Sequence, residues 1–156
     1  MIGITGRVLL FLLVVMVAAM AYLYLSQDRM VYPRRQYRSG YEKMLPRNAV
    51  PLEYRIACGL QKGWYVPPKN VKDPKEMPAR IWMLFGGNGS LALFWQETVD
   101  NAKDDDAGFI LLDYPGYGFC EGAPSPQSIS DSAEGIVAGL AKYLDVDVDE
   151  LRGQPF

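Results

Sequence analysis

The sequence of 156 residues contains no histidine. Histidine is the usual general base near neutral pH and the commonest metal ligand, so its absence removes the simplest routes to proton transfer and metal binding. Only two cysteines are present, Cys58 and Cys120, and they form no Cys-x-x-Cys pattern. A disulfide framework or a zinc site is therefore not expected. We predict that the protein has no metal and no cofactor.

Basic blocks are also scarce. The net charge is −2, and the only basic stretch follows the apolar N-terminal segment. Nucleic-acid binding is therefore not expected. Apolar residues make up 49% of the chain and charged residues 22%, which is the balance of a folded protein.

One long apolar run lies near the N-terminus. Residues Val8 to Leu25 are uncharged over a length at the lower limit for crossing a bilayer. We predict that residues 1–26 form a single-pass transmembrane segment and that the membrane is a partner of the protein. A cleavable signal peptide is the alternative, because Arg7 precedes the run and Ala19-Met20-Ala21 matches a cleavage site.

Residues 27–51 form a basic, turn-rich connector, whose aromatic residues Tyr32, Tyr37 and Tyr41 are expected to pack it onto the domain. Residues 52–156 are predicted to form a globular domain. The positive-inside rule favours the cytoplasmic side for the connector, whereas a signal-anchor often has the opposite orientation. The sequence leaves the side of the membrane open.

The domain begins with two candidate strands that would pair as an antiparallel hairpin. Leu52–Cys58 alternates apolar and polar residues, Gly59 interrupts the pattern, and Lys62–Val66 follows. Arg80–Phe85 is a nearly continuous apolar run, typical of a strand covered on both faces. Phe109–Leu112 is a second buried strand of the same type.

Two helices are predicted, one after each of these buried strands. Ser90 is the expected N-cap of the first. Its expected apolar face consists of Leu91, Phe94, Trp95, Thr98 and Ala102. Ser125-Pro126 is the expected start of the second helix, and Ser128 with Asp131 offers an alternative start. Its expected apolar stripe consists of Ile129, Ala133, Ile136, Val137, Leu140, Ala141 and Leu144. The order of elements predicts an α/β domain, with helices on both faces of an open sheet in a three-layer α/β/α sandwich.

Two glycine-rich loops follow the carboxyl ends of the two buried strands, where open α/β sheets bind ligands. The first, Gly86–Ser90, leaves backbone N–H groups unshielded, so that they can face a developing oxyanion or a phosphate. A glycine turn needed only for its geometry explains the same residues. The second loop runs from Asp113 to Ser125. Asp113 is expected to accept backbone N–H groups and fix this loop, whose structural glycines are Gly116, Gly118 and Gly122.

Together the loops resemble those of the α/β-hydrolase superfamily. A strand ending in a small glycine motif is followed by a helix, and then by a strand ending in D-Y-P-G-Y-G-x-x-x-G-x-P-S. An apolar anchor followed by Val31-Tyr32-Pro33 resembles the membrane-anchored members of the superfamily. The resemblance covers about residues 52–151 and implies the N-terminal half of the hydrolase fold. The activity that it implies is hydrolysis of an ester, thioester or amide through a serine acyl-enzyme.

The resemblance also implies roles for the first loop. Asn88 would supply one backbone N–H of an oxyanion hole, supported by Gly86, Gly87 and Gly89. Gly86 occupies the position where the superfamily usually has histidine, which removes the usual bracing of this loop.

The remaining machinery is missing from the sequence. The superfamily places its nucleophile in Gly-x-Ser-x-Gly, followed later by an acid and a histidine, and the chain contains no such motif. The strand that would carry the motif is expected to begin at about Leu151. We therefore predict a truncated or split hydrolase without a catalytic residue of its own. It would act on a small acyl substrate only if a missing C-terminal half completed it. Two alternatives are a non-catalytic, membrane-tethered module that binds an anion and a gene fragment without function.

Overall fold

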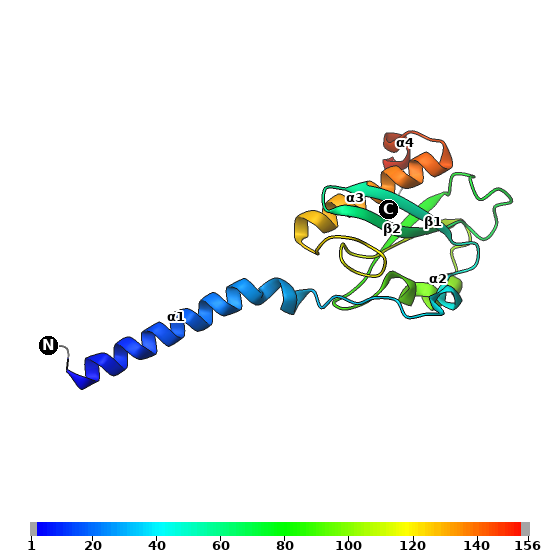
Figure 1. Cartoon of the computed structure of the whole chain (residues 1–156). Helices are drawn as coiled ribbons and strands as arrows, with labels where there is room; N and C mark the ends of the chain where they lie inside the picture. The colour runs from blue at the N-terminus through cyan, green and yellow to red at the C-terminus, as the bar shows by residue number, and fades with distance from the viewer. Residues whose placement is uncertain (1–2, 154–156) are drawn as a thin grey trace. The chain divides into compact units, whose positions relative to one another are not determined.

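A computed structural model describes residues 3–153, and its contacts divide the chain into two units that meet between Pro33 and Arg34 (Figure 1). The first unit is dominated by helix α1, Ile4–Val31. The apolar part of α1, Ile4–Gln27, has 24 residues and is long enough to cross a membrane. None of that stretch is buried by the rest of the protein. By length and composition the helix is able to span a bilayer. A signal sequence near the N-terminus would have the same properties.

The second unit contains a mixed sheet of four strands in the order β1-β2-β4-β3. The predicted hairpin is confirmed as β1, Val50–Ile56, paired antiparallel with β2, Gly59–Val66. Strand β4, Ala107–Leu112, pairs antiparallel with β2 and parallel with β3, Arg80–Phe85. All six residues of β4 are buried, as predicted for a central strand.

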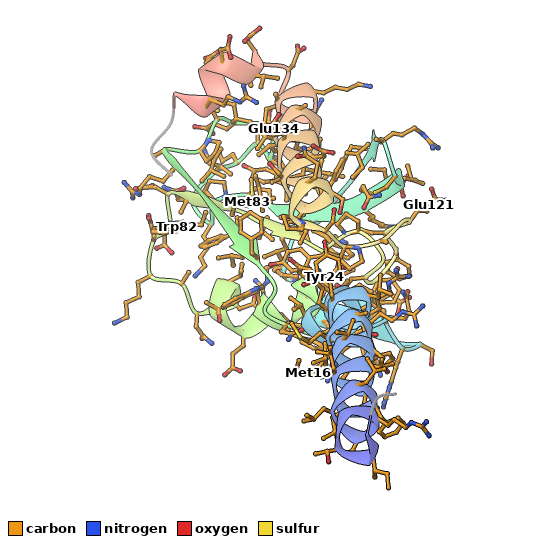
Figure 2. The ribbon with its side chains drawn as sticks, turned by 90° about the vertical axis from the view of Figure 1, so that its left-hand side faces the viewer. Met16, Tyr24, Trp82, Met83, Glu121 and Glu134 are labelled. Carbon is orange, nitrogen blue, oxygen red and sulfur yellow. The ribbon has the colours of Figure 1, made fainter. Side chains whose placement is uncertain are left out.

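Strand β3 differs from its prediction. It is the outer strand of the sheet, and within the described residues its other edge pairs with no strand. Trp82 is 48% exposed and Phe85 is 40% exposed, so β3 is not covered on both faces. Figure 2 labels Trp82 and Met83 on this outer strand. The apolar run therefore forms a mostly uncovered edge strand, in which only Ile81 is fully buried.

Two apolar cores lie on opposite faces of the sheet. On one face, Tyr65 and Ile110 pack with helix α3, Pro126–Leu144, and with the short helix α4, Val148–Arg152. On the other face, Trp64 and Leu111 pack with the 3-10 helix η2, Ala92–Trp95, and with α2, Gln96–Asp100. Figure 1 shows α3 and α4 on one side of the hairpin and α2 on the other.

The first predicted helix is wrong in its start and in its face. Leu91, not Ser90, is the N-cap residue, and no side chain caps the helix. Leu91 is buried as predicted, but Phe94 is 49% exposed and Thr98 is exposed. The residues that pack on the sheet are instead Ala92, Leu93 and Val99. The first N–H of the helix, that of Ala92, donates to a buried carboxylate 21 residues further along the chain, Asp113.

Helix α3 begins as predicted. Ser125 is its N-cap, with Pro126 in the first turn. Ser125 Oγ accepts the Ser128 N–H, and Ser128 Oγ accepts the Ser125 N–H. The two bonds complete a capping box. The buried face contains Ile136, Val137, Leu140, Ala141 and Leu144 of the predicted stripe, whereas Ile129 and Ala133 are only half-buried.

The region where a further strand was expected is helical. Leu151 lies in α4 and is fully buried in the α3 core, so no strand begins there. The rest of that expectation falls on residues 154–156, which lie outside the described residues.

Candidate functional site

The two glycine-rich loops meet at the carboxyl ends of β3 and β4. These strands are parallel neighbours, so their carboxyl ends lie at the same edge of the sheet. The Tyr114 hydroxyl donates to the Gly86 carbonyl at 2.7 Å, and Asp113 Oδ1 accepts the Ala92 N–H at 2.8 Å. The structure therefore brings together the two loops that the sequence singled out.

The first loop contains a tight turn. The Ser90 N–H donates to the Gly87 carbonyl at 3.0 Å, and Gly89 has φ of +67°, in the left-handed region. Asn88 lies at the tip and is exposed. Within the described residues, the N–H groups of Gly87, Asn88 and Gly89 donate to no acceptor. Of these three residues, Gly87 and Asn88 are exposed and Gly89 is buried.

Gly86 is buried at the start of this turn. A Cβ at this position would lie 3.1 Å from the Ser90 carbonyl oxygen, so a side chain there requires the turn to shift. The Trp95 indole N–H donates to the Phe85 carbonyl at 3.1 Å, which holds the end of β3 against η2. The bracing of this loop therefore comes from Tyr114 and Trp95.

The second loop depends on its glycines. Gly116, Gly118 and Gly122 have φ of +81°, +54° and +86°, which L side chains rarely adopt. A Cβ at Gly116 would lie 2.9 Å from the Gly122 carbonyl oxygen, and one at Gly118 would collide with Asp113 Oδ2. The loop is folded tightly around the carboxylate that precedes it.

Asp113 links the loops from a buried position, where it is 2% exposed. Burial raises its pKa from 3.8 to about 6, and the Ala92 N–H and the nearby Tyr37 hydroxyl limit that rise. Oδ2 is buried without a hydrogen-bond partner among the described residues, and the Tyr37 hydroxyl lies close enough to lower the pKa. Asp113 was expected to fix its own loop, and its hydrogen bond instead reaches the first loop's helix.

Connector residues contribute to the site. The sequence predicted that Tyr37 and Tyr41 would pack on the domain, which is confirmed, but it did not single out Arg35 or Gln36. The Gln36 amide donates to the Gly116 carbonyl at 3.2 Å, and the Arg35 carbonyl accepts the Gly118 N–H at 2.9 Å. The Tyr37 hydroxyl accepts the Leu93 N–H at 3.2 Å. Burial raises the pKa of Tyr37, so this hydroxyl stays protonated. The rings of Tyr37 and Tyr41 pack with Phe119 at 5.1 and 4.8 Å between centroids.

The second loop is also fixed to the turn between β1 and β2. The Leu60 N–H donates to Glu121 Oε2 at 2.7 Å, and the Glu121 N–H returns a bond to the Leu60 carbonyl at 2.9 Å. Glu121 is labelled in Figure 2. A side chain at Gly122 would lie 2.7 Å from the Cys58 carbonyl oxygen. The loop is therefore held from three sides: the connector, the β1–β2 turn and η2.

Cys120, the thiol at this edge, is not an activated nucleophile. Burial raises the pKa of the Cys120 thiol to about 12, and its Sγ contacts the Lys62 backbone at 3.4 Å. Ser125 and Ser128 cap α3. Both cysteines are free thiols. Between residues 3 and 153 there is no group of three or more cysteine, aspartate or glutamate residues placed to hold a metal ion.

The fold defines a mixed α/β domain joined to an apolar N-terminal helix. The chain matches no known family profile. Over 89 residues it is 24% identical to the protein YfhR of Salmonella typhimurium, whose name describes it as uncharacterized. The match covers 57% of this chain and 30% of that relative. The chain therefore covers less than a third of the relative's length, and the similarity assigns no activity.

Proposed function

We propose that this chain is the N-terminal, oxyanion-binding part of a serine hydrolase domain of the α/β-hydrolase type, preceded by a single-pass membrane anchor. The main observation that supports this proposal is the turn at the end of β3, where the N–H groups of Gly87, Asn88 and Gly89 have no acceptor among the described residues. Backbone N–H groups fixed in this way stabilise the negative charge of a tetrahedral intermediate. Their position beside the second glycine loop, at the carboxyl edge of the sheet, is where such a site is expected.

The order of strands supports the same proposal. Strand β3 carries the turn, and its apolar side chains Trp82 and Phe85 are exposed at the open edge of the sheet. Apolar outer strands are normally covered, because an unpaired edge invites association with other chains. A further strand along this edge would cover the apolar strip. In the proposed enzyme, that strand would lead into the nucleophile, and the three-layer α/β/α sandwich would then be complete.

The chemistry assigned to the chain is limited to oxyanion binding. A nucleophile, an acid and a histidine must come from outside these 156 residues, because the sequence has neither histidine nor Gly-x-Ser-x-Gly. In the completed enzyme, the serine would attack an ester, thioester or amide carbonyl. The Asn88 N–H would then receive the oxyanion. Alone, the chain binds without turnover.

The donor role is tested with amide NMR shifts. Methylphosphonate, a small oxyanion, is titrated into the full chain in detergent micelles. We expect saturable shifts of the Gly87, Asn88 and Gly89 amides. Asn88→Ala keeps the backbone N–H and should keep the shifts, whereas Asn88→Pro removes the donor and should lose them. Equal shifts in both variants, or none in the native chain, would show that the turn has only a structural role.

The hydrolase assignment is tested separately. We expect the purified chain to release no p-nitrophenol from p-nitrophenyl butyrate above background. We also expect the reading frame after Phe156 to encode a strand followed by Gly-x-Ser-x-Gly. Turnover that a serine-reactive phosphonate blocks would refute the proposal that the nucleophile lies outside this chain. A downstream frame without the motif would favour a binding module.

A further inference from the structure

A hollow of about 610 Å³ lies between the connector and the start of η2. Its lining residues include two exposed arginines, Arg35 and Arg38, and the apolar Met44, Leu91 and Phe94. Leu91 is 4% exposed and Phe94 is 49% exposed, so the apolar part extends from the core to the rim. Cationic groups beside an apolar wall fit an amphipathic anion, since a wholly polar ion would leave the apolar wall in water.

Charge is distributed unevenly along the chain. Residues 27–51 contain six lysine and arginine residues against two acidic ones, a net charge of +4. Residues 52–156 contain nine basic residues against sixteen acidic ones, a net charge of −7. Arg34, Arg35 and Arg38 are exposed, and no ion pair between described side chains uses them. Positive charge is therefore concentrated on the segment that follows the apolar helix.

The connector backbone around Arg35 is held against the domain. The Arg35 carbonyl and the Gln36 amide bond to the second glycine loop, and Tyr37 packs edge-on against the Trp64 ring at 5.8 Å between centroids. Backbone order around Arg35 reduces the entropy lost when a ligand binds. This is a folded surface and not a flexible basic tail.

Chain length keeps the hollow near a bilayer that contains α1. The helix ends at Val31, and Arg35 is four residues further on, a reach of at most ~14 Å. Anionic headgroups attract nearby basic residues over a Debye length of about 8–10 Å. The covalent connection thus limits how far Arg35 can lie from the end of α1.

We propose that this hollow binds an anionic phospholipid of the bilayer that holds α1. The headgroup phosphate lies between Arg35 and Arg38, and the glycerol and upper acyl carbons lie against Met44 and Phe94. The proposal requires α1 to span the bilayer. It does not depend on the hydrolase assignment, because neither the turn at Asn88 nor a nucleophile takes part.

Hydrogen exchange of the full chain in lipid nanodiscs tests this proposal. Phosphatidylcholine discs are compared with discs in which phosphatidylglycerol replaces up to 40% of the lipid. We expect the peptides covering residues 34–44 and 91–95 to exchange more slowly as the phosphatidylglycerol content rises. Because α1 inserts through its apolar length, every variant is reconstituted equally and only the domain's contact with lipid is compared.

The double variant Arg35→Gln/Arg38→Gln should need at least fivefold more phosphatidylglycerol for half of the protection, since one basic residue near an anionic surface contributes roughly that factor. Lys72→Gln/Lys103→Gln removes the same charge from exposed lysines elsewhere and should leave the curve unchanged. Equal protection in both disc types, or equal curves for the two variants, would overturn the proposal. Protection by millimolar glycerol 1-phosphate in phosphatidylcholine discs would also overturn it and assign the hollow to a soluble phosphate.

Discussion

Asp113 should make the domain less stable as the pH rises from 4 to 7.5, and Asp113→Asn should remove this effect. Burial raises the pKa of the carboxyl group in the folded state from its ordinary value of 3.8 to about 6. Between these values the folded state keeps a proton that the unfolded state releases. The stabilisation is therefore present below pH 4 and is lost as the pH rises through 6. The difference corresponds to about 2–3 kcal/mol between pH 4 and 7.5.

The measurement is urea unfolding of the full chain in mild detergent micelles, followed by tryptophan emission. All three tryptophans, Trp64, Trp82 and Trp95, lie in the domain and not in α1. The free energy of unfolding of the native chain, minus that of Asp113→Asn, should fall by about 2–3 kcal/mol between the two pH values.

A non-titrating variant provides the control. Ser125→Ala removes the helix cap and should lower stability by about 1 kcal/mol at both pH values. If the difference for Asp113→Asn were the same at pH 4 and 7.5, or changed in the opposite direction, the reasoning from burial would be refuted. Asp113 would then be held ionised by its hydrogen-bond donors.

Three further predictions concern packing, reactivity and the open edge. Gly135→Ala should lower the free energy of unfolding by about 1–3 kcal/mol, because the new Cβ would lie 2.6 Å from the Tyr54 ring. Gly139→Ala, whose Cβ would have 4.0 Å of room, should instead be neutral or stabilising by up to about 1 kcal/mol. Iodoacetamide at pH 8 should leave Cys120 unmodified until urea unfolds the domain, which peptide mass spectrometry would show; rapid labelling would contradict its raised pKa of about 12. Trp82→Lys should reduce aggregation measured by light scattering, because it places a charge on the exposed edge strand; unchanged aggregation would mean that association uses another surface.

The sequence predicted those elements whose signals are local. The β1–β2 hairpin followed from alternation interrupted at Gly59, which has φ of +131° in the turn. The start of α3 followed from Ser125 and Pro126, which cap a helix without help from distant residues. Strand β4 followed from an apolar run that is buried on both faces.

The remaining features depend on contacts between distant residues. The runs of β3 and β4 are similarly apolar, and only their places in the sheet make one exposed and the other buried. The first helix was misplaced, and its first N–H, that of Ala92, bonds to Asp113, a contact that no local pattern encodes. The two loops were correctly singled out from their glycines, and the packing of Tyr37 on the domain was predicted from its place in an aromatic connector. The hydrogen bonds of Gln36 and Tyr37 were missed because their partners lie 80 and 56 residues away.

The strand order also affects how the chain folds during synthesis. Strand β3 leaves the ribosome before β4, the only neighbour that it has among the described strands. From Phe85 to Leu112 the chain grows by about 27 residues, a delay on the order of one to five seconds at typical rates of translation. Throughout that interval Trp82, Met83 and Leu84 have no strand to pair with. The nascent chain thus exposes an unpaired apolar strand in addition to the apolar N-terminal helix. Chaperone binding to the strand and membrane targeting of the helix would therefore occur during the same short period of synthesis.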